Sequence, residues 1–382
     1  MENNTNIFKT EQKMIGLIKM GFHWLHFSDL HLTPNVDFDS GYARLKLLEF
    51  LDRETVNKRL PCDYVFITGD MAHQNNYGGV QVFMLDLIRS LNWTPEKSNR
   101  IFWAVGNHDI SRESKLRKMV IHSIRNAENK EKRFEEYIYD PEICKVLHTN
   151  GMSRYLSWHK EILCQDAYSV NSLHSWYKLI DLNLIVLNTC LTSCDKDDEH
   201  NLCIKEIGLQ KIFDGLDPFN PTFVIGHHGK EFFTLETQKS LGHLFDTKNV
   251  DLYLCGHSHW LGYDVFQQAS RELPQITCGG GTLDDYSGIS FMHGYYDSER
   301  HEVTIQPYSY AERGNRNWQL DRTLHWKLDG ENKIPLTGKR SIPPPIRHRV
   351  YIDNNGGTME SATKEWQSSF FASSKKNRKD AL

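Results

Sequence analysis

The amino-acid sequence predicts an α/β fold, a layered domain with a largely parallel sheet. Runs of β-forming residues alternate along the chain with segments whose apolar residues recur at helical spacing. A short polar cluster follows directly after each of five such runs. In open α/β sheets, ligands bind beyond the carboxyl ends of the strands. The five clusters are Ser28-Asp29-Leu30-His31, Gly69-Asp70, Gly106-Asn107-His108-Asp109, Gly226-His227-His228 and Gly256-His257-Ser258-His259.

The first hundred residues read strand, helix, strand, helix, strand. Strands are expected at 25–27, 63–68 and 101–105, each ending at one of the clusters. The pair Asp39-Ser40 is a candidate cap for the first helix. The apolar face of this first helix would consist of Leu45, Leu48, Leu51 and Val56. The apolar face of the second helix would consist of Val80, Phe83, Met84, Leu87 and Leu91.

Residues 111–165 interrupt this alternation. One predicted helical face there consists of Leu116, Met119, Val120, Ile124 and Ala127, and a charge run follows at 130–136. Two interpretations stay open at this stage. The segment is either a solvated helical insert packed on the body or a cap that selects the substrate, since long insertions near strand ends often carry specificity.

The alternation resumes after the insert. Predicted helices cover 207–216 and 235–245, and predicted strands cover 179–187, 222–225, 252–255, 276–278, 291–296 and 303–308, with the last three extending a second sheet. The domain is expected to span 22–328. A loose leader would occupy 1–21, and a polar, basic linker or disordered tail 329–382, because the chain turns polar there and contains Pro343-Pro344-Pro345.

Composition restricts the class of protein. The chain has 39% hydrophobic and 25% charged residues, an ordinary globular balance, and no apolar run approaches the roughly 20 residues that cross a bilayer. The net charge is −4, divided into +4 for 329–382 and −8 for the rest, so the body is not typical of a duplex-binding protein. The eight cysteines form no C-x-x-C pair, which favours a reduced, cytoplasmic protein.

The clusters contain enough ligands for two metal ions. They offer two carboxylates, one amide oxygen and four imidazoles, from Asp29, His31, Asp70, Asn107, His227, His257 and His259. Nitrogen and oxygen ligands without thiolate suit two divalent ions of Mn, Fe, Zn or Co, with manganese favoured. Two such ions, two carboxylates and one bridging hydroxide leave a charge of about +1, which attracts a phosphate ester.

The order D-x-H, G-D, G-N-H-D, G-H and G-H-x-H resembles the calcineurin-like metallophosphoesterases, over a stretch from about Trp24 to about Cys278. The resemblance implies a four-layer α/β/β/α fold with the metals at the edge of a β-sandwich. It also implies that Asp70 bridges the two metals. The family places its ligand directly after the glycine, which selects His227 rather than His228. One metal would be held by Asp29, His31 and His259, and the other by Asn107, His227 and His257.

The resemblance also implies two catalytic residues. His108 is similar to the family's non-ligand histidine, which would stabilise charge or protonate the leaving oxygen, and its alternatives are a metal ligand or a passive neighbour. Asp109 would orient the His108 ring, and its alternative is a helix N-cap.

Departures from the family pattern reduce the number of branches of the family that the chain can resemble. The arginine that protein phosphatases carry after the bridging aspartate is missing, and His73 stands where purple acid phosphatases have tyrosine. The bacterial class III cyclic-nucleotide phosphodiesterases resemble the chain most, followed by SbcD-type nucleases, which have glycine where Thr33 stands. We therefore expect a phosphodiesterase acting on a nucleotide-type substrate, through attack by a hydroxide that bridges the metals. Alternatives are an SbcD-like nuclease, a phosphomonoesterase, or a non-catalytic scaffold; a protein partner on the tail stays open.

Overall fold

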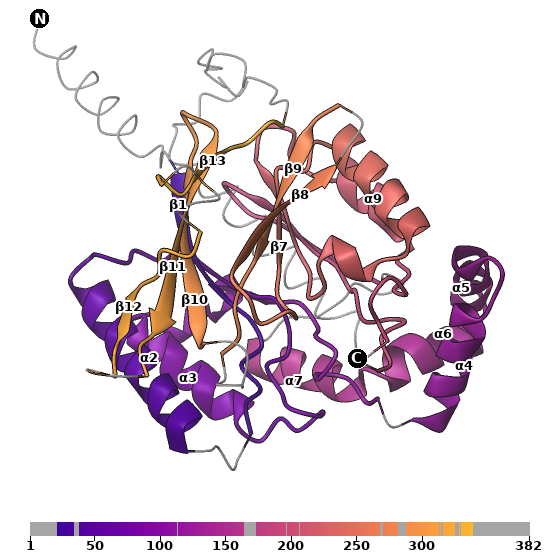
Figure 1. Cartoon of the computed structure of the whole chain (residues 1–382), viewed down its shortest axis with the longest axis horizontal. Coiled ribbons are helices and arrows are strands. Elements are labelled where there is room, and N and C mark those ends of the chain that lie inside the picture. The colour runs from indigo at the N-terminus through magenta and orange to yellow at the C-terminus, as the bar shows by residue number, and fades with distance from the viewer. Residues whose placement is uncertain are drawn as a thin grey trace, which may run out of the picture. The chain divides into compact units, whose positions relative to one another are not determined.

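Strands at most of the predicted positions pair into two sheets in the computed structural model of the chain (Figure 1). The structure describes residues 21–338 apart from 34–37, 113, 164–172, 196, 206, 268–269, 282–287, 313, 315, 325–327 and 329. Residues 1–20 of the predicted leader and 339–382 of the predicted tail lie outside this described part.

The first sheet has the strand order β12-β11-β10-β1-β2-β3, with β13 paired to β11. The pairs β1–β2 and β2–β3 are parallel, whereas β10 runs antiparallel to β1 and β11 antiparallel to β10. The strands are β1 (Gly21–Phe27), β2 (Tyr64–Ile67), β3 (Ile101–Trp103), β10 (Ser290–Asp297), β11 (Glu302–Tyr310), β12 (Trp318–Leu320) and β13 (Lys333–Pro335).

The second sheet has the order β4-β5-β6-β7-β9-β8, with β5, β6, β7 and β9 parallel and an antiparallel strand at each edge. Its strands are β4 (Ser175–Lys178), β5 (Asn183–Val186), β6 (Thr222–Ile225), β7 (Leu252–Cys255), β8 (Gly262–Gln267) and β9 (Glu272–Thr277).

The helices connect these strands or form the insert. Several begin at residues whose side chains accept a backbone N–H of the first turn, such as Ser114, Asn129 and Thr234. None of the helices in the described ranges combines the length and apolar character that crossing a membrane needs. The helices are α2 (Phe38–Val56), α3 (Val80–Ser90), α4 (Lys115–Arg125), α5 (Lys130–Tyr139), α6 (Pro141–Lys145), α7 (Ser153–Leu163), α8 (Ile207–Asp214), α9 (Leu235–Thr247), and the short turns η1 (Pro95–Arg100), η2 (Val146–Asn150) and η3 (Lys230–Phe232).

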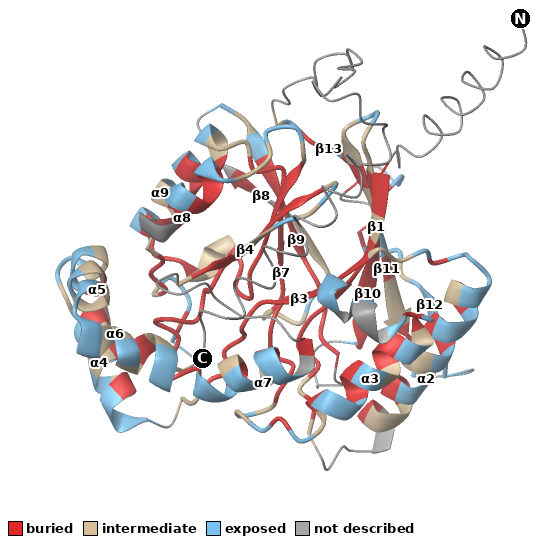
Figure 2. Ribbon diagram, turned by 180° about the vertical axis from the view of Figure 1, so that it is seen from behind, coloured by how far each residue is buried: buried red, intermediate tan, exposed pale blue. Residues whose placement is uncertain are grey.

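Alternation along the strands produces four layers. In β1, Phe22 and Trp24 pack into the core between the two sheets, while Leu25 and Phe27 pack into the core shared with α2 and α3. A third core joins the outer face of the second sheet to α8 and α9. Both sheets are therefore covered on both faces, which is why their central strands are buried throughout (Figure 2). This confirms the predicted α/β/β/α architecture.

Several local predictions are corrected. Strands β10 and β11 pair in the first sheet, beside β1, and not in the second. The buried face of α2 includes Leu47 and Leu51, whereas Leu45 is exposed. The predicted tail starts too early, because β13 pairs with β11 and buries Ile334.

The insert is helical, as predicted, but its buried face shares only part of the predicted one, including Ile124. In α4, Ile121 and Ile124 are buried, together with Arg117, while Leu116 and Met119 are exposed. The guanidinium of Arg117 donates hydrogen bonds to three backbone carbonyls of the loop after β5, those of Cys190, Leu191 and Ser193. The insert is therefore fixed to this loop by hydrogen bonds as well as by apolar packing.

Candidate metal centre

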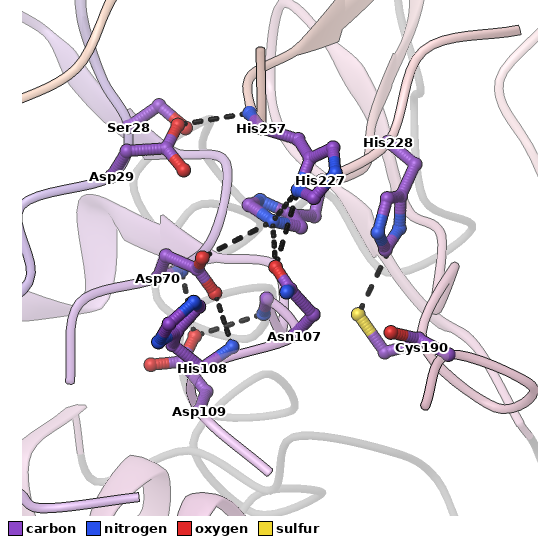
Figure 3. Close-up of polar contacts among 12 residues, drawn as sticks. Ser28, Asp29, Asp70, Asn107, His108, Asp109, Cys190, His227, His228 and His257 are labelled. Carbon is purple, nitrogen blue, oxygen red and sulfur yellow. Dashed lines mark hydrogen bonds and ion pairs between the residues drawn. The ribbon is translucent and has the colours of Figure 1, made fainter. Parts of the chain in front are cut away.

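All five polar clusters lie at the carboxyl ends of parallel strands. The first three follow β1, β2 and β3 in the first sheet, and the last two follow β6 and β7 in the second. The two sheets pack face to face, so these strand ends bring the clusters to one edge of the sandwich. Figure 3 shows side chains from all five clusters lying close together. All seven predicted ligands lie in one connected group of side chains, as the following distances show.

The backbone at these strand ends turns sharply. Five of the seven predicted ligands have a left-handed backbone, with φ of 53° at Asp29, 43° at His31, 53° at Asp70, 69° at His257 and 60° at His259. Positive φ is uncommon outside glycine, but Asp, Asn and His adopt it more readily than most residues. Such conformations cluster at functional sites, where the surrounding structure holds the strain.

Asp29, His31 and His259 form one compact group. The His31 Nε2 lies 3.3 Å from the His259 Nε2, which lies 3.4 Å from the Asp29 Oδ1. The ligand atoms of all three residues lie within 4.8 Å of one another. Asp29 is fully buried, and its other oxygen accepts the backbone N–H of His257. This is the trio that the resemblance assigns to one metal.

The second group surrounds the Asn107 amide. Its Oδ1 lies 2.8 Å from the His227 Nε2 and 3.2 Å from the His257 Nδ1, and the two imidazole nitrogens are 3.1 Å apart. Asp70 lies between the two groups, with its Oδ2 3.4 Å from the His227 Nε2 and 4.0 Å from the His31 Nε2. Asp70 therefore has the position that a bridging carboxylate needs.

The charges in this cluster favour a cation. Burial favours the neutral imidazole of His227, yet the carboxylates of Asp70 and Asp29 outweigh it and raise the pKa of His227 to about 9. Burial would raise the pKa of Asp29, but the neighbouring imidazoles of His259 and His227 lower it to about 2. Both shifts show that positive charge is stabilised between the two carboxylates.

The donor chemistry fits a metal as well. The Asn107 Oδ1 faces the imidazole nitrogens of His227 and His257 and the carboxylate of Asp70, which are all acceptors when unprotonated. Turning the amide over would make it a hydrogen-bond donor to the same three groups. Lone pairs converging from an amide, two imidazoles and a carboxylate are the ligands that Mn, Fe, Zn and Co share.

His108 lies beside these groups. Its ring centroid is 4.7 Å from that of His31 and stacks on His73 at 5.2 Å. Burial lowers the pKa of His108 to about 4, against a smaller opposing effect of the Asp70 carboxylate. One ligand nitrogen each of His31, His73 and His108 also lies within 4.8 Å of the others. The position of His73, left open by the sequence, is thus at the edge of the first metal group.

Asp109 does not have the position predicted for it. Its carboxylate accepts the backbone N–H groups of Asp70, Ala72 and Gly106, at 2.8–2.9 Å, and none of its hydrogen bonds goes to the His108 ring. It is not a helix N-cap either, since α4 is capped by Ser114. Burial and the nearby Asp70 carboxylate raise the pKa of Asp109 to about 7. Asp109 therefore ties together the loops after β2 and β3 that carry Asp70 and Asn107.

The contact between these two loops requires glycine at position 106. A Cβ on Gly106 would lie 2.1 Å from the Asp70 Oδ1 and 2.2 Å from its backbone nitrogen, far inside van der Waals contact. We expect Gly106→Ala to displace Asp70, to reduce metal retention and to lower the free energy of unfolding by about 1–3 kcal/mol. Urea denaturation and elemental analysis measure both effects.

Gly288→Ala is the matched control, because no atom of the described residues lies within 4 Å of the Cβ that it would add. Its free energy of unfolding should change by no more than about 0.5 kcal/mol. A Gly106→Ala protein with unaltered stability and metal content would contradict this account of the loops.

Sequence reasoning missed a cavity beside the ligands. It has a volume of about 370 Å³, and Asn107 and His257 form one wall. The other walls are Arg112, Lys118, Cys194, Asp195, Asp198 and Phe232. These residues come from the insert, the loop after β5 and the turn before α9. Nothing in the sequence indicates that most of these residues lie near the predicted ligands. Arg112 is the exception, because it follows the G-N-H-D motif by three residues.

His228, which the resemblance sets aside as a ligand, also lies close to the second group, since one ligand nitrogen each of His227, His228 and His257 lies within 4.8 Å of the others. The His228 Nδ1 forms a 2.8 Å hydrogen bond with the Thr189 Oγ1. The same nitrogen lies 3.9 Å from the Cys190 Sγ, a contact that Figure 3 draws. The His228 ring packs 4.4 Å from the ring of His257. His228 thus packs against the imidazole of His257. The Nε2 of His227, in contrast, faces Asn107 and Asp70.

The chain is similar to several known proteins. A metallophosphoesterase-like protein of Bacillus subtilis, YydB, itself uncharacterised, is 25% identical over 76% of this chain, and the match spans 60% of its length. A dimetal phosphatase from Danio rerio matches in structure with a TM-score of 0.42 and 10% identity, covering 78% of this chain and 98% of that one. For a purple acid phosphatase from yellow lupin, the TM-score is 0.43, the identity 12%, and the coverage 76% and 51%. The sequence pattern of the calcineurin-like phosphoesterase family matches residues 22–261, more than half of the chain, which therefore belongs to that family.

Proposed function

We propose that the protein hydrolyses phosphate esters with two divalent metal ions, and that it is a phosphodiesterase acting on a nucleotide-type substrate. One observation carries this proposal. Seven nitrogen and oxygen ligands lie in two adjacent groups, with Asp70 within 4.0 Å of an imidazole from each. Two-metal sites of this kind are typical of enzymes that clamp the attacking and leaving oxygens of a phosphate.

Each group of residues has a separate role in this proposal. One ion would be held by Asp29, His31 and His259, and the other by Asn107, His227 and His257. Asp70 would serve as a ligand shared by the two groups. The ions, with manganese favoured, would supply Lewis-acid chemistry that activates water and offsets the phosphate charge. His108 assists the leaving oxygen from beside His31. Asp109 acts indirectly, because its carboxylate fixes the loops that carry Asp70 and Asn107.

The preference for a diester follows from the surroundings of the ligands. The cavity of about 370 Å³ that begins at Asn107 and His257 is larger than a phosphate group requires, and it has the size of a small-molecule site. It therefore favours a substrate with a sizeable group on the phosphate. The net charge of −8 outside 329–382 argues against duplex DNA, and the motif resemblance to cyclic-nucleotide phosphodiesterases supports a nucleotide.

The test is an assay of the protein purified with manganese on bis(p-nitrophenyl) phosphate beside p-nitrophenyl phosphate. We expect the diester to be hydrolysed faster, and chelation followed by manganese should abolish and then restore the activity. Cyclic mononucleotides, single-stranded DNA and phosphomonoesters then separate a nucleotide phosphodiesterase from a nuclease and from a monoesterase. No turnover of either p-nitrophenyl ester by protein with metal bound would overturn the proposal.

A further inference from the structure

The guanidinium of Arg112 lies where an anion beside the metal ligands would meet it. Its Nη2 is 3.4 Å from the His108 Nε2. Its Nη1 is 3.0 Å from the amide atom of Asn107 that points away from the imidazoles. Arg112 also lines the cavity that Asn107 and His257 share. Arg112 thus contacts the predicted ligand Asn107 and its neighbour His108, and it also lines the cavity.

The Asn107 amide decides what Arg112 can bind. When its Oδ1 faces the metal ligands, its NH2 faces the Arg112 Nη1, so that two donors meet without an acceptor. Among the residues that the structure describes, the other hydrogen-bond contact of the guanidinium is the ring nitrogen of His108, at a long 3.4 Å. An anionic oxygen in the cavity would accept from both the amide and the guanidinium, and guanidinium groups match phosphate oxygens well.

The cavity carboxylates do not neutralise Arg112. Asp195 and Asp198 are both ion-paired with the guanidinium of Arg125, and Asp198 also accepts the hydroxyl of Ser193. No ion pair of Arg112 with a carboxylate occurs among the residues that the structure describes. The positive charge of Arg112 is therefore available to a bound group.

We propose that Arg112 binds a non-bridging oxygen of the substrate phosphate, and that the cavity between the metal ligands and the helical insert holds the ester group. This inference rests on the proposed function and names the insert as part of the substrate site. Besides Asn107 and His257, the cavity is lined by Phe232, which adds an apolar surface, and by Arg112, Lys118, Cys194, Asp195 and Asp198. The fixed contact of Arg117 with the loop after β5 holds this lining together.

The experiment compares the manganese-loaded wild type with Arg112→Ala, Arg112→Lys and the control Arg133→Ala. Arg133 lies on α5, half-exposed, and pairs with Glu136 outside the cavity. Steady-state kinetics on bis(p-nitrophenyl) phosphate and calorimetric binding of inorganic phosphate are the readouts, together with metal content. We expect Arg112→Ala to raise KM and the phosphate dissociation constant by about 10–100-fold, with metal content unchanged. Arg112→Lys should have KM and phosphate dissociation constants between those of wild type and Arg112→Ala. Arg133→Ala should have the same values as wild type.

Two results would overturn the inference. One is an Arg112→Ala protein whose KM and phosphate affinity stay within about twofold of wild type, and the other is loss of metal from that variant, which would make Arg112 a support for Asn107. Failure of the proposed function gives a different result, because a wild type without turnover can still bind phosphate. The dependence of that binding on Arg112 then tests the inference alone.

Discussion

Asp70→Ala is expected to lose metal and to lower turnover of bis(p-nitrophenyl) phosphate by at least about 10⁴-fold. Asp70 is the one predicted ligand that lies within 4.0 Å of imidazoles from both metal groups. Removing it takes away a ligand from each ion and half of the carboxylate charge that the ligand set supplies. Two cations held a few ångströms apart then repel each other without the anion between them.

The measurement combines turnover with metal equivalents per chain after dialysis. Asp86→Ala is the matched control, since Asp86 lies on the exposed side of α3 and pairs with Arg89. The control should keep two equivalents and full activity. An Asp70→Ala protein that retains both ions would refute the bridging role, and retained activity without metal would refute the metal mechanism itself.

His108→Ala is expected to keep both metals and still lower turnover by about 10²–10⁴-fold, the usual contribution of one positioned proton donor or acceptor. The reason is the position of the ring. It contacts His31 and His73, and its Nε2 faces Arg112. The Asn107 amide and Asp70 carboxylate, in contrast, face the imidazoles of the second group.

His243→Ala serves as the control for His108→Ala, because His243 is an exposed histidine of α9 and belongs to no group of possible metal ligands in the described part of the chain. Metal content and turnover are measured on both variants at the same manganese concentration. Loss of metal from His108→Ala would show that His108 is a ligand, which is the alternative that the sequence left open. Unchanged turnover with metal bound would show that it is a passive neighbour.

The grouping of the predicted metal ligands at one place could be anticipated from the sequence because their signal is local. Each ligand follows its strand within a few residues, so that a β-forming run and the next polar residues carry both the element and the ligand. Residues 222–225 and His227 illustrate this, as do 252–255 and His257. Parallel strands in one sheet then bring their ends to one edge, without further information.

Other features could not be predicted because they depend on distant partners. The strands at 290–297 and 302–310 have patterns that fit either sheet, and the pairing of the first with β1, and of the second with the first, decides. Which face of α4 is buried depends on the loop after β5, whose carbonyls accept from Arg117 and so place a charged residue inside. The cavity wall formed by Arg112 and Phe232 joins residues far apart in the chain. The predicted role of Asp109 beside the His108 ring differs from the position found. Two of the backbone N–H groups that it accepts belong to the distant residues Asp70 and Ala72, which the residues around Asp109 in the sequence do not reveal.

The division of the ligands between the two sheets has a consequence for how the protein acquires its metals during synthesis. His31 and His259, which lie 3.3 Å apart, are separated by 228 positions in the chain. At translation rates of 5–20 residues per second, roughly 10–45 s pass between the emergence of the first and the last ligand from the ribosome. The nascent N-terminal half can offer an ion only the ligands after β1, β2 and β3. Loading of the complete pair must therefore wait until the last strand ends have been made.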